Sequence, residues 1–195
     1  MLTEKELLAI LEKTGLLKEG HFLLTSGLHS SQYMQCAQLL QYPEYAEVVC
    51  QALAEPFQGR GIEVVVGPAL GGVIVAYETS RALKAKNIHA ERENGKMTFR
   101  RGFALVPGQK VLIVEDVVTT GGSVKEVMNL VRQAGAELVG VAAIVDRSQG
   151  RADFGVPFHA LLKRDIPTYS PEDCPLCRQG IPVVKPGSRN IASSA

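Results

Sequence analysis

The chain has 195 residues, an apolar content of 46% and a formal net charge of +1 at pH 7. This length and apolar content are sufficient for one well-buried domain, and the balanced charge argues against broad binding to nucleic acid or membranes. The longest apolar runs are strand-sized and no charged-then-apolar leader opens the chain, so we expect a cytoplasmic protein without membrane spans.

The first 60 residues predict a helix followed by a short extended segment. A helix over residues 3–14 begins with a capping box formed by Thr3 and Glu6, and it ends at a glycine. Residues 21–27 and 31–35 are expected to be short strands around a turn, which together form a small hood. A further helix begins near Pro43, because proline is favoured in the first turn of a helix.

From residue 62 onward, strands and helices alternate along the chain. Strands are predicted at 62–66, near Ile88, Val111 and Leu138, and at 158–162, with a helix from the turn at 67–72 to about residue 86. This alternation predicts an α/β fold with a central parallel sheet flanked by helices. We expect a single domain, with the N-terminal helix and hood in 1–60, the α/β core in 61–165 and an irregular tail in 166–195.

Residues 111–123 form the most informative segment. Four apolar residues suit a strand buried on both faces, and Glu115 and Asp116 follow at its carboxyl end, where open α/β sheets bind ligands. A turn of hydroxyls and glycines then leads into a predicted helix, whose first backbone N–H groups would bind a phosphate. Carboxylates repel phosphate but accept hydrogen bonds from neutral hydroxyls, so a sugar phosphate is the expected ligand. The alternative is a solvated strand end followed by an ordinary turn.

The sequence excludes two other phosphate-binding motifs, because residues that they require are absent. A P-loop requires a lysine before the hydroxyl residue, and no lysine precedes Ser123. A dinucleotide-binding fingerprint requires three glycines, and the nearest candidate, which starts at Gly59 and Gly61, has Val64 in the third position.

The segment resembles the signature of the type I phosphoribosyltransferases, which is an apolar strand, two acids, two apolar residues and then Thr-x-Gly-x-Ser. The resemblance implies the type I phosphoribosyltransferase fold and the donor phosphoribosyl pyrophosphate (PRPP). The residues implied to bind PRPP here are Glu115, Asp116, Val117, Val118, Thr119, Thr120, Gly121, Gly122 and Ser123. It also implies catalytic roles for Asp116 and Glu115, and a Mg²⁺ ion held mainly by PRPP rather than directly by the protein.

A second loop also leads from a strand into a helix, and its amides can form another anion site. Residues 67–72 read Gly-Pro-Ala-Leu-Gly-Gly, which resembles the pyrophosphate loop of the orotate phosphoribosyltransferases in particular. The resemblance implies that Ala69, Leu70, Gly71 and Gly72 bind PRPP. An ordinary strand-to-helix turn with glycines for close packing is the alternative.

Residues 84–101 are strongly basic, with six lysines or arginines and two glutamates. Residues 92–102 follow a predicted strand and show no strong periodicity of apolar residues. We expect them to form a mobile lid. In orotate phosphoribosyltransferases a loop here reaches across a homodimer to the neighbouring active site, which implies PRPP binding by Arg92 and both PRPP binding and catalysis by Lys96. A solvated surface loop is the competing interpretation.

The acceptor base is indicated by Asp146, Arg147 and Gly150, which resemble the Asp-Arg-x-x-x-Gly segment of orotate phosphoribosyltransferases. A guanidinium matches the carboxylate and carbonyls of orotate. The resemblance implies orotate binding by Arg147, Thr119, Ser26 and Tyr33. For Arg147 the alternative is a surface ion pair with Asp146 or Asp153.

The implied activity is transfer of phosphoribose from PRPP to orotate, which gives orotidine 5′-phosphate and pyrophosphate in pyrimidine synthesis. The alternatives are a purine or other nucleobase phosphoribosyltransferase, and a PRPP-binding regulator without catalysis. A regulator would require a nucleic-acid-binding element, and no helix-turn-helix or basic face outside the lid is visible. The expected partners are therefore PRPP, orotate and a second copy of the chain.

The resemblance covers almost the whole chain from the first helix to about Leu162, with definite departures. Many family members have a lysine at the positions of Thr25, Gly71 and Glu93, and a histidine at the position of Thr98. Arg100 and Arg101 are the candidates to replace these contacts with the donor.

Four cysteines are present, and two of them form Cys174-Pro-Leu-Cys177 in the tail, a feature that resembles the shorter bacterial branch typified by Thermus enzymes. We expect a local turn. A zinc site would require two more ligands, for which the same pair in a second subunit is one source, and a redox disulfide is the other alternative.

Overall fold

The computed structural model describes residues 2–24 and 26–186, and the chain divides into two compact units. The first unit contains Met1–Leu16 and Cys36–Asp165, and the second contains Leu17–Gln35 and Ile166–Ala195. The expected single domain with boundaries near 60 and 165 stays a prediction, because internal packing does not decide whether the units fold independently.

The first unit contains a six-stranded sheet. Its strands are β3 (Val64–Pro68), β4 (Lys86–Glu93), β5 (Lys96–Phe99), β6 (Lys110–Val118), β7 (Glu137–Asp146) and β8 (Phe158–Lys163). They lie in the order β5-β4-β3-β6-β7-β8, and every neighbouring pair is parallel except β4 and β5. The predicted central parallel sheet is confirmed.

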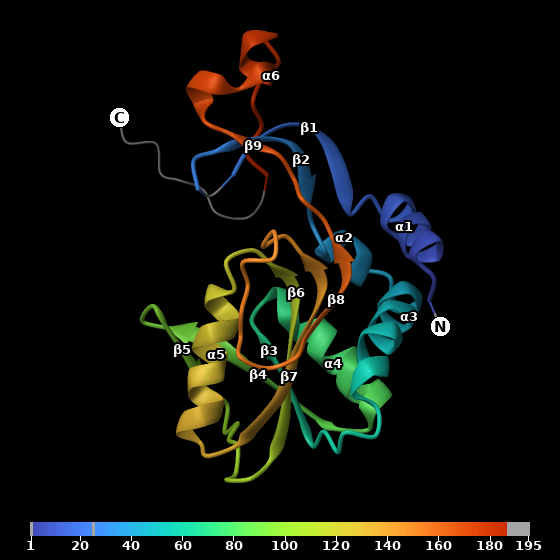
Figure 1. Ribbon diagram of the computed structural model, residues 1–195, viewed down its shortest axis with the longest axis vertical. Helices are drawn as coiled ribbons and strands as arrows, with labels where there is room; N and C mark the ends of the chain where they lie inside the picture. Colours follow the sequence, from blue (N-terminus) through green and yellow to red (C-terminus); the bar gives the residue numbers. More distant parts are fainter. Residues whose placement is uncertain (1, 25, 187–195) are drawn as a thin grey trace. The chain divides into compact units, whose positions relative to one another are not determined.

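The first unit also contains helices. They are α1 (Glu4–Lys13), α2 (Ala37–Leu40), α3 (Pro43–Ala54), α4 (Gly71–Leu83) and α5 (Gly122–Gln133), with a 3₁₀ turn η1 at Glu55–Phe57. Figure 1 shows α5 on one side of the sheet and α3 and α4 on the other. The capping box at Thr3 and Glu6 is present. In the part of the chain that the structure describes, no helix is both long and apolar enough to cross a membrane.

Alternating side chains bury both faces of the sheet. Val111 and Ile113 in β6 pack in a cluster with Val127 of α5. Leu112 and Val114, which point to the opposite face, are also completely buried. Burial on both faces is therefore the reason why this strand lacks the alternation of polar and apolar residues, as its sequence predicted.

Part of the basic segment is a β-hairpin, so the prediction of an aperiodic loop is wrong over residues 92–99, whereas residues 100–102 are irregular and the mobile lid stays a prediction. β4 continues to Glu93, and β5 pairs with it in an antiparallel register that sets Arg92 opposite Met97. Asn94 and Gly95 connect the strands with φ values of 51° and 79°. Two consecutive positive φ angles are typical of the tight hairpin turn that Asn-Gly favours, and this dipeptide is the sequence signal for the hairpin.

The second unit contains a small antiparallel sheet in the order β1-β2-β9. Its elements are β1 (Leu17–Leu23), β2 (His29–Met34), β9 (Thr168–Tyr169), a 3₁₀ turn η2 (Pro171–Asp173) and the short helix α6 (Pro175–Arg178). Two strands were expected here, and both begin earlier than predicted. The expected irregular tail is only partly irregular, because its β9 pairs with β2. Thr25 and the last nine residues lie outside the described residues.

Candidate functional site

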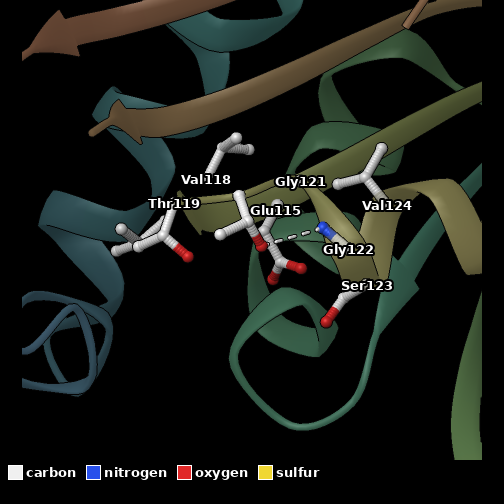
Figure 2. A pocket seen from close by; sticks show the side chains of 9 residues that line it. Glu115, Val118, Thr119, Gly121, Gly122, Ser123 and Val124 are labelled. Atoms are coloured by element: carbon white, nitrogen blue, oxygen red, sulfur yellow. Dashed lines mark hydrogen bonds between the residues drawn. The ribbon is translucent and has the colours of Figure 1, made fainter. Parts of the chain in front are cut away.

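The acid pair and the hydroxyl-rich turn lie together at the carboxyl end of β6, as predicted. A pocket there is lined by Glu115, Val117, Val118, Thr119, Thr120, Gly121, Gly122, Ser123 and Val124. Figure 2 shows the side chains of Glu115, Thr119 and Ser123 around this pocket. One continuous segment therefore supplies both carboxylate and hydroxyl groups to the same small volume.

The two carboxylates differ in their surroundings. Glu115 is buried, with 8% of its surface exposed, whereas Asp116 is partly exposed. Burial, and then the charge of Asp116, raise the pKa of Glu115 well above its usual value of 4.5. Asp116 is oriented by the Val117 backbone N–H, which donates to its Oδ1 at 2.7 Å. The pair therefore resists double ionisation in the free protein, and Asp116 is the more solvent-exposed of the two acids.

The N-terminus of α5 is open to an anion. Gly121 occupies the N-cap position with a φ of 75°, and no side chain caps the helix. A Cβ atom on Gly121 would lie 2.8 Å from Cε1 of Phe154, so both the backbone conformation and the packing require glycine. A weak hydrogen bond of 3.4 Å joins the Gly122 N–H to the Thr120 hydroxyl, drawn as the dashed line in Figure 2. The first amides of this helix are therefore available to bind phosphate.

The second glycine-rich loop lies directly beside the acid pair. It connects β3 to α4, and β3 is the parallel neighbour of β6. A Cβ atom on Gly71 would lie 2.2 Å from Oδ2 of Asp116, so the Asp116 carboxylate fills the space that this glycine leaves. The N-cap of α4, Leu70, is 88% exposed and makes no side-chain capping bond. The peptide bond between Ala69 and Leu70 is cis. Two uncapped helix N-termini therefore follow adjacent strands.

The predicted base-binding arginine follows β7, the other neighbour of β6. The backbone N–H of Arg147 donates to the Val118 carbonyl at 2.8 Å. Asp146 has a local structural role, because its carboxylate accepts the Ser148 N–H at 2.8 Å. Asp153 likewise accepts the N–H of Gly155 at 2.9 Å. The main chain of Arg147 therefore lies at the carboxyl end of β6.

Cys36 is a site residue that the sequence reasoning missed. It stands at the start of α2, and its thiol approaches the Asp116 carbonyl oxygen at 3.8 Å. Burial, and then the charges of Asp116 and Glu115, raise the pKa of this thiol well above 9.0, whereas the charge of Arg147 lowers it. The thiol is therefore kept neutral beside the acid pair. Because Cys36 lies 80 residues before Asp116 in the chain, no local sequence pattern indicated that the two residues are neighbours.

The hairpin carries its cationic side chains on the surface. The guanidinium of Arg92 forms a two-pronged ion pair with Glu126 of α5, at 2.6 and 2.9 Å. Arg100 pairs with Glu93 at 3.2 Å, and Arg101 pairs with Glu91 at 3.1 Å. The side chain of Lys96 is exposed and makes no ion pair with any described residue. Exposed pairs of this kind are weak, so the cations can exchange their glutamates for a stronger anion.

The remaining two predicted base-binding residues belong to the second unit. Ser26 is exposed in the turn between β1 and β2, and the ring of Tyr33 lies 5.7 Å from that of Phe22. Their role in binding orotate stays a prediction.

Comparison with known proteins agrees with this geometry. The phosphoribosyl transferase domain family matches residues 35–154. An orotate phosphoribosyltransferase from Thermotoga maritima is 61% identical over 182 residues, which cover 93% of this chain and 97% of the relative. The crystal structure of orotate phosphoribosyltransferase from Aeropyrum pernix is 25% identical with a TM-score of 0.66, and the match covers 80% of this chain and 93% of that one.

Similarity of fold alone does not distinguish between acceptor bases. The crystal structure of adenine phosphoribosyltransferase from Rhodothermus marinus also gives 25% identity and a TM-score of 0.66, with 80% of this chain and 99% of that one covered. The distinction comes from the much higher sequence identity to the Thermotoga relative over nearly the full length of both chains. The chain belongs to the phosphoribosyltransferase family and, within it, to the orotate phosphoribosyltransferases.

Proposed function

We propose that the protein transfers the phosphoribosyl group of PRPP to orotate, which yields orotidine 5′-phosphate and pyrophosphate for pyrimidine nucleotide synthesis. One observation carries the proposal: an acid pair and two uncapped helix N-termini meet at the ends of adjacent strands, with Gly71 against Asp116. The amides suit two phosphate groups, and the acids suit the ribose between them.

The chemistry separates charge. A ring nitrogen of orotate forms a bond to the anomeric carbon of the ribose while the bond from that carbon to pyrophosphate breaks. Positive charge develops on the ribose, next to Asp116 and Glu115, and negative charge develops on pyrophosphate. Lys96 and Arg92 of the hairpin are the cations assigned to the leaving group. No enzyme nucleophile is required.

Mg²⁺ is part of the proposal, as an ion that arrives on the substrate. The acid pair at the amide-rich pocket fits this role, because it would orient ribose hydroxyls, which are hard oxygen ligands of the kind that Mg²⁺ prefers. The bound ion would neutralise charge that accumulates on pyrophosphate. Protein residues then orient the ribose and hold the phosphates, rather than enclosing the metal themselves.

Orotate is favoured over a purine by Arg147, because its guanidinium matches a carboxylate that adenine and hypoxanthine lack. The test is to incubate the protein with PRPP, Mg²⁺ and orotate, uracil, adenine or hypoxanthine in turn, and to follow the absorbance of each base. Consumption of orotate alone supports the proposal. Consumption of a purine would favour the alternative enzyme, and PRPP binding without turnover of any base would favour the regulator.

Asp116→Asn tests the assigned role of the acid pair. Because the variant removes the charge that stabilises the ribose in the transition state, turnover should fall by on the order of 10²-fold or more while some PRPP affinity remains. Asp153→Asn is the matched control, since it makes the same chemical change at an exposed residue outside the pocket. Equal turnover in the two variants would remove Asp116 from the mechanism.

A homodimer in which the hairpin reaches the neighbouring active site is also proposed. In support of it, Ile74 and Tyr77 leave apolar surface exposed on α4, at 46% and 58%. Mixing two inactive variants, Asp116→Asn and Lys96→Ala, tests it. In mixed dimers with exchanged hairpins one of the two sites is intact, so about one quarter of the parent activity should return. No recovery after subunit exchange would place Lys96 in its own subunit's site.

A cytoplasmic location belongs to the same proposal. None of the four cysteines forms a disulfide, which is typical of proteins in a reducing compartment.

A further inference from the structure

Four side chains with metal-binding atoms converge inside the second unit. They are His21 in β1, His29 at the start of β2, Cys174 just before α6 and Cys177 within α6. Their ligand atoms all lie within 4.8 Å of one another. Three of the four residues are buried, and only Cys177 is exposed. The two missing partners of the Cys-x2-Cys pair therefore come from the same chain, not from a second subunit.

Three nitrogen–sulfur distances in this cluster are close to those of a tetrahedral zinc site. With metal–sulfur bonds of about 2.3 Å and metal–nitrogen bonds of about 2.0–2.1 Å, tetrahedral zinc places its nitrogen and sulfur ligands about 3.6 Å apart. Cys174 Sγ lies 3.4 Å from His21 Nε2, Cys177 Sγ lies 3.8 Å from the same nitrogen, and Cys177 Sγ lies 3.3 Å from His29 Nδ1. The two imidazole nitrogens are 2.8 Å apart, which is about half an ångström closer than zinc would hold them.

The backbone orients His21 for metal binding. Its Nδ1 lies 2.7 Å from the Ile181 carbonyl oxygen, which can only accept, so Nδ1 carries the hydrogen. The lone pair is therefore on Nε2, the atom that points into the cluster. The Val184 N–H also donates to the His21 carbonyl at 2.8 Å. A hydrogen bond from the ring nitrogen that faces away from the cluster, here Nδ1 to the Ile181 carbonyl, is the arrangement that metal-binding histidines usually show.

We propose that His21, His29, Cys174 and Cys177 bind one Zn²⁺ ion that holds the second unit together. Two thiolates and two imidazoles are a donor set that selects zinc over Mg²⁺ or Ca²⁺. Four protein ligands leave no open coordination position, so the ion is structural and takes no part in phosphoribosyl transfer. The site is separate from the acid pair and from any Mg²⁺ that arrives with PRPP.

The composition of the second unit explains why it needs a metal. Among its described residues the buried apolar side chains are only Phe22, Met34, Ile166 and Cys174. The other buried residues are His21, His29 and Ser30. Small units with little apolar core usually depend on disulfides or metals for stability. The ion would join β1 and β2 to a segment about 150 residues further along the chain, and the free energy of metal binding would add to the stability of the folded unit.

Metal analysis of tag-free protein purified without chelator tests the site. We expect about one zinc per chain by mass spectrometry of the metals, and none in the double variant Cys174→Ala/Cys177→Ala. The matched control is Cys50→Ala, which removes a buried thiol of α3 in the other unit and should leave zinc unchanged. Zinc retained by the double variant would overturn the assignment, as would parent protein that stays metal-free after incubation with zinc.

A second measurement covers the case in which the double variant does not fold. Cys177→His replaces an exposed ligand with another zinc donor, so the variant should keep the metal. Cobalt in place of zinc should give the visible absorption of a tetrahedral site, together with a thiolate-to-cobalt band that weakens in Cys177→His. An octahedral cobalt spectrum would overturn the proposal. So would a Cys174–Cys177 disulfide in protein purified under reducing conditions.

Discussion

Substitution of Gly121 tests whether the turn before α5 is the phosphate site. Gly121→Ala puts a side chain at a φ of 75°, which costs about 1–2 kcal/mol for a residue other than glycine. It also places Cβ 2.8 Å from the Phe154 ring, so the loop must shift by about 0.6 Å to reach an ordinary contact of about 3.4 Å. This shift moves the amides that we assign to phosphate.

Gly108→Ala is the matched control for backbone strain. Gly108 has a φ of 79°, an added Cβ would meet nothing within 4 Å, and the residue precedes β6 at the end away from the acid pair. Both variants should therefore lose about 2–8 °C of melting temperature, since each kcal/mol corresponds to about 2–4 °C in a chain of this size. Only Gly121→Ala should also lose PRPP affinity.

The expected loss of affinity follows from the hydrogen bonds at stake. A backbone N–H bond to a charged phosphate contributes about 1.5–3 kcal/mol, so misplacing one of them should raise the Kd for PRPP by on the order of 10- to 100-fold. Calorimetry with Mg²⁺ present, combined with the KM for PRPP, measures this change. If both variants bind PRPP as tightly as the parent, the phosphate does not rest on this turn.

Three further substitutions probe the charged groups around the site. Because the pKa of Glu115 is raised in the folded state, the stability that its protonated form contributes is complete below about pH 4.5 and is lost as the pH rises through the folded-state pKa. Glu115→Gln should therefore gain melting temperature over the parent as the pH rises from 4.5 to neutrality, and a difference independent of pH would contradict the raised pKa. Glu126→Gln releases Arg92 from its exposed ion pair and should lower the KM for PRPP by about two- to fivefold, whereas a higher KM would mean that Arg92 acts while paired. Lys96→Ala should lower kcat by on the order of 10²-fold without changing the melting temperature, and a parallel loss of both would indicate a structural role for the hairpin.

The acid pair and the turn before α5 were predictable from the sequence because they lie in one continuous segment. One stretch from Val111 to Ser123 contains the buried strand, the acids and the turn, and the rule that parallel strands present their carboxyl ends at one edge brings the loop at Gly71 beside it. The hairpin is also encoded locally, because Asn94 and Gly95 form the dipeptide that favours a tight turn between two strands. Glu126, Phe154 and Cys36 were not predictable. Each acts on the site through a tertiary contact, and no local sequence pattern indicates such a contact.

The second unit shows the opposite case. Cys174 and Cys177 carry a recognisable spacing, yet half a zinc motif is ambiguous without its partners. Those partners, His21 and His29, lie on neighbouring strands about 150 residues earlier, and each alone resembles an ordinary strand residue. They lie beside the two cysteines because β9 pairs with β2 and Val184 pairs with Phe22 of β1, which brings the segment between residues 168 and 184 next to these strands. A unit whose interior is made of imidazoles and thiols rather than aliphatic side chains gains little from hydrophobic burial alone, so the metal supplies the cohesion that its composition lacks.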